Sequence, residues 1–235
     1  MDAKLIVSFR KEFPRIRIEG EFEFERGFNV ILGPSGCGKT TTFRIICGLE
    51  NPDEGFIRCC EEVFLDTRKD IYLPPQKRRL GVVFQEDNLL PHLSVKENIE
   101  FATRKAGGKV ENIDELIEHF GLEALKDKKP KELSGGEKQR VAIVRALASN
   151  PRALLMDEPF SSLDFRRKMS IMEFLKGLKF NIPVVIVTHD PFETLFLADK
   201  VFIMEKGRKV CEGGRELVEG VFSELLKLSG AQPSF

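Results

Sequence analysis

The sequence lacks an excess of either charge, a long apolar run and a metal-binding spacing of cysteines. Lys and Arg together number 37, as do Asp and Glu, so the zero net charge does not favour nucleic acid or an anionic membrane as a partner. No apolar run approaches the ~20 residues of a membrane-spanning helix, and the first residues resemble a short strand, not a signal peptide. The five cysteines show no C-x-x-C or histidine-linked spacing, which indicates reduced thiols in a cytosolic protein.

What remains is the ordinary balance of a globular protein. The 235 residues are 42% apolar and 31% charged, and they contain no internal repeat or low-complexity tract. A chain of this length suits one large α/β domain or two closely joined subdomains.

The most informative stretch is Gly-Pro-Ser-Gly-Cys-Gly-Lys-Thr at residues 33–40, which matches the phosphate-loop pattern G-x-x-x-x-G-K-[ST]. An apolar run at 28–32 predicts a buried strand before it, and 41–47 predicts a helix after it. Small residues let backbone N–H groups surround a phosphate, and the helix N-terminus adds positive partial charge. The predicted nucleotide-binding residues are Gly33, Pro34, Ser35, Gly36, Cys37, Gly38, Lys39, Thr40 and Thr41.

Strands are expected on both sides of this loop. Residues 5–9 predict a first strand, and the strict alternation over 15–25 predicts a half-buried antiparallel strand in which Gly20 is a bulge or a turn. Either Phe9 or Phe13 is a candidate to stack on an adenine ring, although a core position explains each phenylalanine equally well. Further strands are predicted at 55–60, 62–66 and 80–84, with a polar connector at 72–79.

The second half alternates helices with buried strands. Residues 94–120 form a helical stretch that is broken at Gly107-Gly108, and a helix is expected over 138–148. Another helix is expected over 165–178, a buried strand over 183–188, a strand pair over 200–205 and 208–211, and a final helix over 215–228.

Two glycines mark a second candidate phosphate site. Ser134 and Glu137 form a capping box at a helix start, but a capping box does not explain Gly135 and Gly136 in the first turn. Glycine within a helix costs about 0.5–1 kcal/mol relative to alanine. Exposed backbone at a helix N-terminus is what a phosphate group requires.

Polar side chains end the buried strands. The strand at 153–158 ends in Asp157, which suits a Mg²⁺ shell, and Glu158, which is placed to orient or deprotonate water. His189 follows the strand at 183–188, and Gln85 follows the strand at 80–84. In open α/β sheets ligands bind at this strand edge.

With these motifs in this order, the sequence resembles the ATP-binding subunit of ABC transporters over essentially its whole length. Residues 33–40 resemble Walker A, Gln85 the Q-loop glutamine, 133–139 the ABC signature and 153–158 Walker B with its catalytic glutamate. Ser162 and Asp164 lie in the segment that resembles the D-loop, and His189 resembles the switch histidine. Phe13 is the choice for the adenine-stacking aromatic, in place of the more usual tyrosine.

The resemblance implies an α/β fold for residues 1–235: a P-loop NTPase core of the RecA type with a mostly parallel sheet. An N-terminal antiparallel β subdomain joins this core, which comprises 1–88 and 150–235, and residues 89–149 form an inserted α-helical subdomain with the signature. A further C-terminal regulatory β-domain is not expected.

The resemblance also implies a mechanism. Two copies pair head to tail around ATP, so that Ser134, Gly135, Gly136 and Glu137 face the partner's nucleotide. Thr40, Gln85 and Asp157 hold Mg²⁺, and Lys39, Glu158 and His189 carry the catalysis.

The helical insert and residues 71–81 are similar to importer subunits, especially those for molybdate, tungstate and related oxyanions. This similarity implies a peripheral subunit at the cytoplasmic face of the membrane, bound to transmembrane permease subunits and working indirectly with a substrate-binding protein. The residues expected to line a groove for the permease are Phe84, Leu89, Leu90 and Phe101. The alternatives are a non-transport ABC ATPase for DNA repair, chromosome organisation or translation, and a small-molecule kinase.

Overall fold

The computed structural model describes residues 3–85, 88–105 and 113–218. Its strands form one hydrogen-bonded sheet in the order β6-β5-β4-β1-β2-β11-β10-β3-β9-β8-β7. The strands are β1 (Leu5–Phe13), β2 (Ile16–Phe24), β3 (Gly27–Leu32), β4 (Glu54–Cys59), β5 (Glu62–Asp66), β6 (Ile71–Tyr72), β7 (Leu80–Val83), β8 (Ala153–Asp157), β9 (Pro183–Thr188), β10 (Lys200–Glu205) and β11 (Arg208–Gly213). The α-helices are α1 (Lys39–Cys47), α2 (Val95–Lys105), α3 (Ile113–His119), α4 (Gly135–Leu147), α5 (Phe165–Gly177) and α6 (Pro191–Leu197).

The strands β10, β3, β9, β8 and β7 are parallel and carry the site. Their sequences are almost continuously apolar because both faces of this part of the sheet are covered. Alternate residues of each strand face opposite sides, so Leu154 and Met156 belong to one core and Leu155 to the other.

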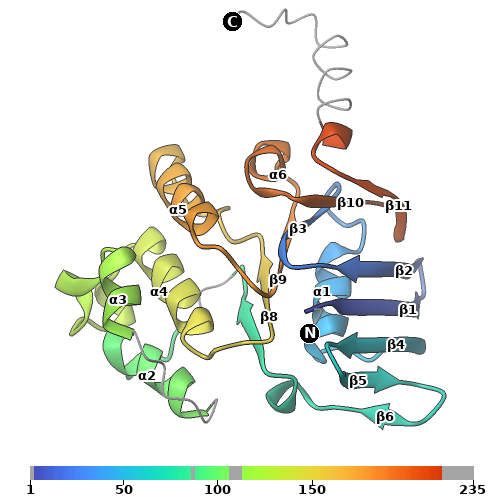
Figure 1. The fold of residues 1–235 in the computed structure, drawn as a ribbon, viewed down its shortest axis with the longest axis horizontal. Coiled ribbons are helices and arrows are strands. Elements are labelled where there is room, and N and C mark those ends of the chain that lie inside the picture. Colours follow the sequence, from blue (N-terminus) through green and yellow to red (C-terminus); the bar gives the residue numbers. More distant parts are fainter. Residues whose placement is uncertain (1–2, 86–87, 106–112, 219–235) are drawn as a thin grey trace, which may run out of the picture.

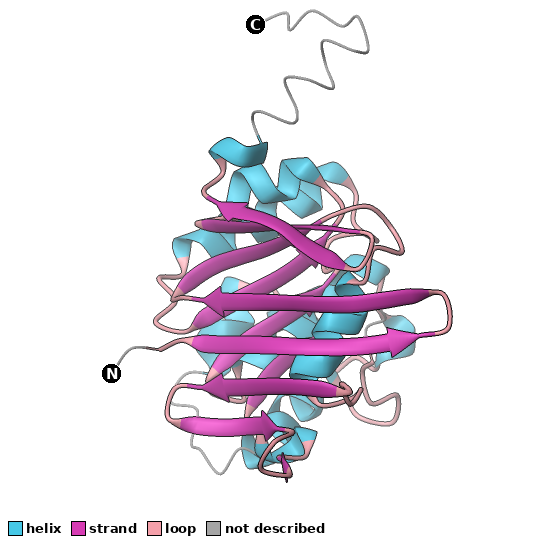
Figure 2. Cartoon of the chain, turned by 90° about the vertical axis from the view of Figure 1, so that its right-hand side faces the viewer, coloured by secondary structure: helices cyan, strands magenta, loops and turns pink. Residues whose placement is uncertain are grey.

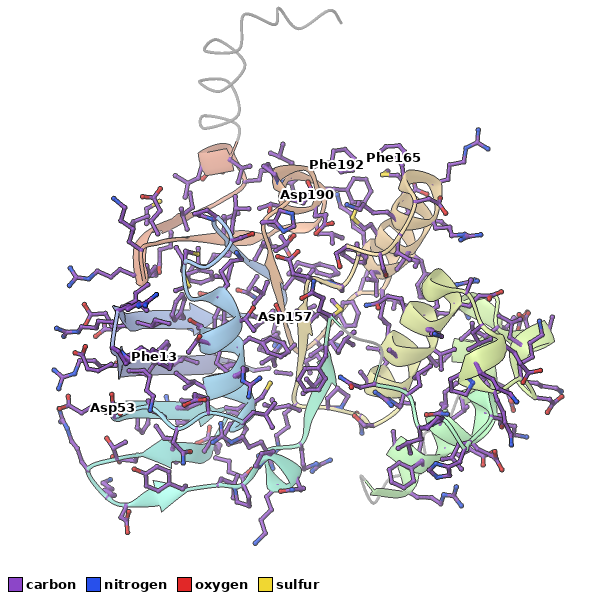
Figure 3. All side chains as sticks on the ribbon, turned by 180° about the vertical axis from the view of Figure 1, so that it is seen from behind. Phe13, Asp53, Asp157, Phe165, Asp190 and Phe192 are labelled. Carbon is purple, nitrogen blue, oxygen red and sulfur yellow. The ribbon has the colours of Figure 1, made fainter. Side chains whose placement is uncertain are left out.

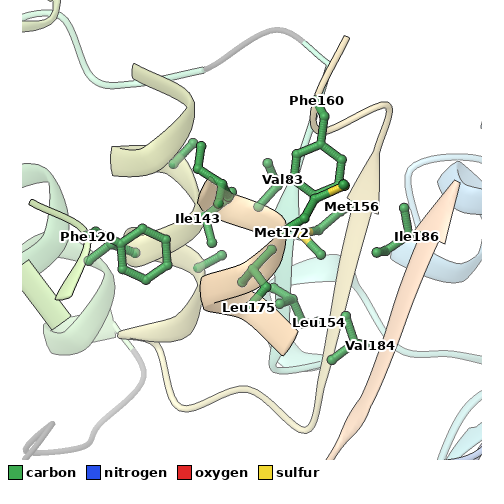
Figure 4. Packing of buried hydrophobic residues seen from close by; sticks show 14 of the residues in the cluster. Val83, Phe120, Ile143, Leu154, Met156, Phe160, Met172, Leu175, Val184 and Ile186 are labelled. Carbon is green, nitrogen blue, oxygen red and sulfur yellow. The ribbon is translucent and has the colours of Figure 1, made fainter. Parts of the chain in front are cut away.

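The first core lies between the parallel strands and the helices α4 and α5, as Figure 4 shows for Val83, Ile143, Met172 and Leu175. The second core encloses α1, because Phe43, Ile45 and Ile46 are buried between the opposite face of the parallel strands and the antiparallel strands. Consequently α1 and α4 lie on opposite faces of the parallel strands (Figure 1).

The antiparallel strands form a layer beside α1, with helices behind them in Figure 2. This layer joins the parallel part through one parallel pairing of Arg208 with Glu19. The expected P-loop core with a mostly parallel sheet and an antiparallel β region is therefore confirmed.

Two details of the antiparallel layer differ from the sequence-based prediction. Strand β1 continues to Phe13 and does not end at Phe9, because its pairing with β2 is unbroken as far as Ile16. Gly20 is neither a bulge nor a turn, since it pairs regularly with Phe9. A Cβ atom there would lie 2.5 Å from the Phe22 ring, so the glycine makes room for that ring.

The helices also differ in part. Helix α4 begins at Gly135 because Ser134 caps it. Helix α6 was not predicted, and its N-terminus is fixed by Asp190, whose carboxylate accepts a hydrogen bond from Phe192 N at 2.8 Å. Gly107 and Gly108, and most of the helix expected over 215–228, lie outside the described residues. Within the described ranges, no helix is both long and apolar enough to span a membrane.

Candidate functional site at the carboxyl ends of the parallel strands

The phosphate loop connects β3 to α1 with a backbone that its glycines make possible. Gly38 precedes α1 with φ of 108°, a left-handed conformation that side chains disfavour. A Cβ atom on Gly33 would lie 2.2 Å from the carbonyl oxygen of Met204, so the loop passes directly against β10. These two positions explain why the pattern places glycine there.

A turn between β10 and β11 supports the loop from the side. Gly207 N donates to the carbonyl oxygen of Cys37 at 3.0 Å, and Glu19 N donates to the carbonyl oxygen of Gly207 at 2.8 Å. This one glycine therefore holds the loop, the hairpin turn and strand β2 together.

The Lys39 side chain lies along the loop and is only 5% exposed. Its ammonium donates to the carbonyl oxygens of Gly33 at 2.7 Å and Pro34 at 3.0 Å. These bonds hold the positive charge within the curve of the loop, beside the backbone that begins α1.

Thr40 and Asp157 meet at the next position along the edge. The Thr40 hydroxyl donates to the Asp157 carboxylate at 3.5 Å. Burial, and next the charge of Glu158, raise the pKa of Asp157 to about 6. A bound cation would reverse this effect by favouring the ionised carboxylate. Hydroxyl and carboxylate oxygens are the donors that Mg²⁺ prefers, so the two side chains fit this ion.

Glu158 and His189 form a pair at the ends of β8 and β9. His189 Nδ1 lies 2.8 Å and 2.9 Å from the two Glu158 carboxylate oxygens. Glu158 has φ of 47°, an unfavourable left-handed conformation for a residue with a side chain. Glu158 directly follows the last residue of β8, and its carboxylate meets His189 there.

The start of α4 presents the second predicted phosphate site. Glu137 accepts hydrogen bonds from Ser134 N at 2.7 Å and Ser134 Oγ at 2.8 Å, which confirms the capping box. The hydrogen bonds that Ser134 donates, first from its backbone N–H and then from its hydroxyl, lower the pKa of the Glu137 carboxyl. A Cβ atom on Gly136 would lie 3.0 Å from Leu163, whereas one on Gly135 would meet no atom within 4 Å. Gly136 is thus packed closely against Leu163 inside the chain, and Gly135 is open to the outside.

Comparison with known proteins shows the family to which the chain belongs. A family model described as "ABC transporter" matches residues 21–161. This chain belongs to the ABC transporter family.

The curated relatives of this ABC chain include molybdenum import ATP-binding proteins named ModC. The protein from Paramagnetospirillum magneticum is 42% identical over 214 residues, which cover 87% of this chain and 59% of that protein. The protein from Methylococcus capsulatus is 44% identical over 209 residues, which cover 87% of this chain and 58% of that protein. The chain thus spans somewhat more than half the length of these relatives.

Solved ABC structures resemble most of the chain. A dimeric post-hydrolysis state of the ATP-binding cassette MJ0796 bound to ADP and Pi has a TM-score of 0.74 and 32% identity, covering 90% of this chain and 98% of that one. The cbiO1 structure from Clostridium perfringens has a TM-score of 0.79 and 27% identity, covering 97% of this chain and 95% of that one.

The two phenylalanines that are candidates for stacking on adenine lie in different surroundings. Phe13 is 37% exposed and lines a hollow of about 360 Å³ together with Ile16, Ile18 and the phosphate-loop residues Gly36, Gly38, Lys39, Thr40 and Thr41. Phe9 is 4% exposed and belongs to the core around α1. Figure 3 shows Phe13 at the end of the antiparallel layer. Phe13 is therefore the aromatic residue placed beside the loop.

Other predicted positions are less closely joined to this group. Gln85 is exposed, and among the described residues it makes no hydrogen bond with Thr40 or Asp157. Asp164 caps α5 by accepting from Arg167 N at 3.1 Å, and Ser162 is exposed.

The residues expected to line a permease groove belong to different surroundings. Phe84 packs against Phe43 with ring centroids 5.7 Å apart, in the core around α1. Leu89 packs against the other core, Leu90 is half-buried and Phe101 is 40% exposed. The groove stays a prediction.

Sequence reasoning missed Lys168, whose ammonium is held by Asp190 and Glu193 beside the His189 segment. Its only sequence signal is a lysine one turn after the helix-capping Asp164. Such a lysine usually faces solvent, so the pattern alone did not mark it.

Proposed function

We propose that this chain is the ATP-binding and ATP-hydrolysing subunit of an ABC importer and that two copies pair head to tail around the nucleotide. The observation that carries this proposal is a row of groups along one edge of the parallel strands. The row consists of the phosphate loop, the candidate Mg²⁺ ligands Thr40 and Asp157, and the Glu158–His189 pair. Its order matches the requirements of phosphoryl transfer to water.

Each side chain has a role in this proposal. Phe13 stacks on the adenine, the loop backbone and Lys39 bind the phosphates, and Thr40 and Asp157 hold Mg²⁺ with help from Gln85. Bound Mg²⁺ supplies positive charge that offsets the phosphate oxygens. Glu158 orients and deprotonates the attacking water, and His189 contacts the γ-phosphate. Most of the rate enhancement then comes from positioning and charge stabilisation.

The position of the second predicted phosphate site supports the pairing of two copies. The loop begins α1 on one face of the parallel strands, and Ser134 and Gly135 begin α4 on the opposite face. In this proposal the Walker A and the signature of one chain serve two different nucleotides. A head-to-tail pair brings each signature to the partner's nucleotide, with Ser162 and Asp164 between the two sites.

Import of molybdate or a related oxyanion is the function we infer from the relatives named for molybdenum import. The partners are then transmembrane permease subunits at the cytoplasmic face of the membrane and, indirectly, a substrate-binding protein. The balanced charge of 37 basic and 37 acidic residues offers nothing to favour the alternative of an ABC ATPase acting on DNA.

The decisive test of paired hydrolysis is the Glu158→Gln variant. It should bind ATP but hydrolyse it at least about 100-fold more slowly, since removing general base catalysis costs about 10²–10⁴-fold. Light scattering should then detect an ATP-dependent dimer, which the exposed-surface control Glu173→Gln should not accumulate. Hydrolysis by Glu158→Gln at the wild-type rate would contradict the role of Glu158, and full activity of a strict monomer would contradict the paired site.

The import assignment needs a separate experiment. The chain should co-purify with a transmembrane permease subunit, and oxyanion-loaded binding protein should stimulate ATP hydrolysis by the complex in vesicles. Stimulation by DNA or ribosomes in place of molybdate or tungstate would favour the non-transport alternative.

A further inference from the structure

Lys168 lies in a small cluster of charged side chains between α5 and α6. Its side chain is 15% exposed, and its ammonium donates to Asp190 Oδ2 at 2.7 Å and to Glu193 Oε1 at 2.6 Å. The Glu193 side chain is only 4% exposed, so this carboxylate depends on the protein for its partners. Figure 3 shows Asp190 at the place where α5 and α6 approach each other.

The same cluster fixes the backbone on both sides of His189. The Thr188 hydroxyl donates to Glu193 Oε2 at 2.6 Å and accepts from Asp190 N at 3.1 Å. Asp190 in turn accepts from Phe192 N at 2.8 Å. Both neighbours of His189 are therefore held by hydrogen bonds, although the His189 ring itself is outside the cluster and 56% exposed.

The lysine also belongs to the segment that follows Ser162 and Asp164. It stands one turn into α5, whose N-terminus is capped by Asp164. One ammonium thus joins the first turn of α5 to the first turn of α6, directly after His189, which meets the carboxylate of Glu158. A displaced ammonium would leave two carboxylates, Asp190 and Glu193, to repel each other next to His189.

We propose that Lys168 is a positioning residue that holds His189 against the carboxylate of Glu158 through Asp190, Glu193 and Thr188. This inference deepens the proposed function, and it rests on that function for the roles of His189 and Glu158. A simpler role for Lys168 would be a structural tie between the two helices. The chain offers a matched control for that role, because Lys176 also joins α5 to α6, donating to the carbonyl oxygen of Phe196 at 2.8 Å.

The first measurement is nuclear magnetic resonance of histidine-labelled full-length chain, which does not depend on ATP hydrolysis. The sequence has three histidines, so the His189 ring signal is assigned by its loss in His189→Gln. Lys168→Met should shift or broaden the His189 ring signals, Lys168→Arg should restore them in large part, and Lys176→Met should leave them as in the wild type. An unchanged His189 signal in Lys168→Met, or equal changes in both methionine variants, would overturn the proposal.

The second measurement separates kcat from KM for ATP. Lys168→Met should lower kcat by between about 10-fold and 100-fold, because misplacing a catalytic group by a fraction of an ångström to 1 Å has effects of this size. The KM should stay near that of the wild type, since the hydrogen-bond partners of Lys168, Asp190 and Glu193, are not among the residues that line the hollow beside the loop. If the lysine acts through His189, Lys168→Met should add almost nothing to the loss already caused by His189→Ala.

The outcomes distinguish the two proposals. An inactive wild-type chain whose His189 signal still responds to Lys168→Met contradicts the proposed ATP hydrolysis and supports the positioning role. An active wild type with fully additive losses in the double variant, or with a higher KM and unchanged kcat, overturns the positioning role alone. If Lys168→Met does not fold, Glu193→Gln removes one charge of the same cluster, and it should shift the His189 signal and lower kcat with the same pattern.

Discussion

Replacing Gly207 with alanine should loosen the phosphate loop from a distance. Gly207 has φ of 85°, and an added Cβ atom would lie 2.0 Å from the carbonyl oxygen of Arg17. The two atoms nearest to the added Cβ, Arg17 O and Arg17 C, belong to the backbone, which cannot move aside as a flexible side chain would. The hairpin turn must therefore retreat from β2 and, with it, from Cys37.

The cost can be worked out from this geometry. A left-handed conformation costs an L-residue about 1–2 kcal/mol. Retreat of the turn weakens the hydrogen bonds to Cys37 O at 3.0 Å and from Glu19 N at 2.8 Å, each worth about 1 kcal/mol. The lower entropy of the unfolded alanine chain offsets about 0.4–1 kcal/mol. The net loss is about 2–3 kcal/mol, which corresponds to a fall in Tm of roughly 5–10 °C for a chain of this size.

Thermal unfolding and titration with a fluorescent ATP analogue test this prediction. ATP should also bind about fivefold more weakly, because the loop loses one backbone anchor worth about 1 kcal/mol. The control is Gly177→Ala at the end of α5, where a Cβ atom meets nothing within 4 Å. That control should keep or raise Tm, since alanine is the better helix former. A Gly207→Ala chain with the Tm and ATP affinity of the wild type would refute the reasoning.

Two further pairs of variants distinguish effects on ATP binding or pairing from effects on folding stability. Phe13→Ala should weaken ATP binding with little change in stability, because a base stacked on an aromatic ring gains about 1–3 kcal/mol, whereas Phe9→Ala should cost about 3–5 kcal/mol of stability as a core truncation. Equilibrium binding and denaturant unfolding measure the two effects, and an unchanged ATP affinity in Phe13→Ala would remove Phe13 from the site. Gly135→Ala should fold normally but form less ATP-dependent dimer, whereas Gly136→Ala should lower stability because its Cβ would press on Leu163 at 3.0 Å. Light scattering and thermal unfolding measure these two outcomes, and equal behaviour of the two glycine variants would contradict the distinction between them.

Much of the fold could be predicted because its signals are local. The strands predicted over 28–32, 153–158 and 183–188 correspond to β3, β8 and β9, since strands covered on both faces need apolar residues at nearly every position. Alternation likewise revealed β2, but it gave no information about the far end of β1, whose length is fixed by pairing with β2 as far as Phe13. Helix α6 escaped prediction because its seven residues are too few to show a clear helical period.

The candidate site was predictable to the extent that its residues follow strand ends or form a compact motif. Thr40, Asp157, Glu158 and His189 meet because parallel strands bring their carboxyl ends to one edge. The supporting contacts were not predictable in this way. Gly207 and Lys168 act through a turn and a helix whose positions beside the site depend on tertiary packing, so no local pattern marks them.

The left-handed backbone conformation of Glu158 lowers the stability of the fold at a position with a proposed role in catalysis. With φ of 47°, this residue costs the fold about 1–2 kcal/mol that glycine would not. Laboratory evolution for heat resistance alone would therefore favour loss of this carboxylate, and consensus design aimed at thermostability should leave the position untouched. If Glu158 has the proposed catalytic role, it is a position where a less stable chain is accepted in exchange for a carboxylate beside His189.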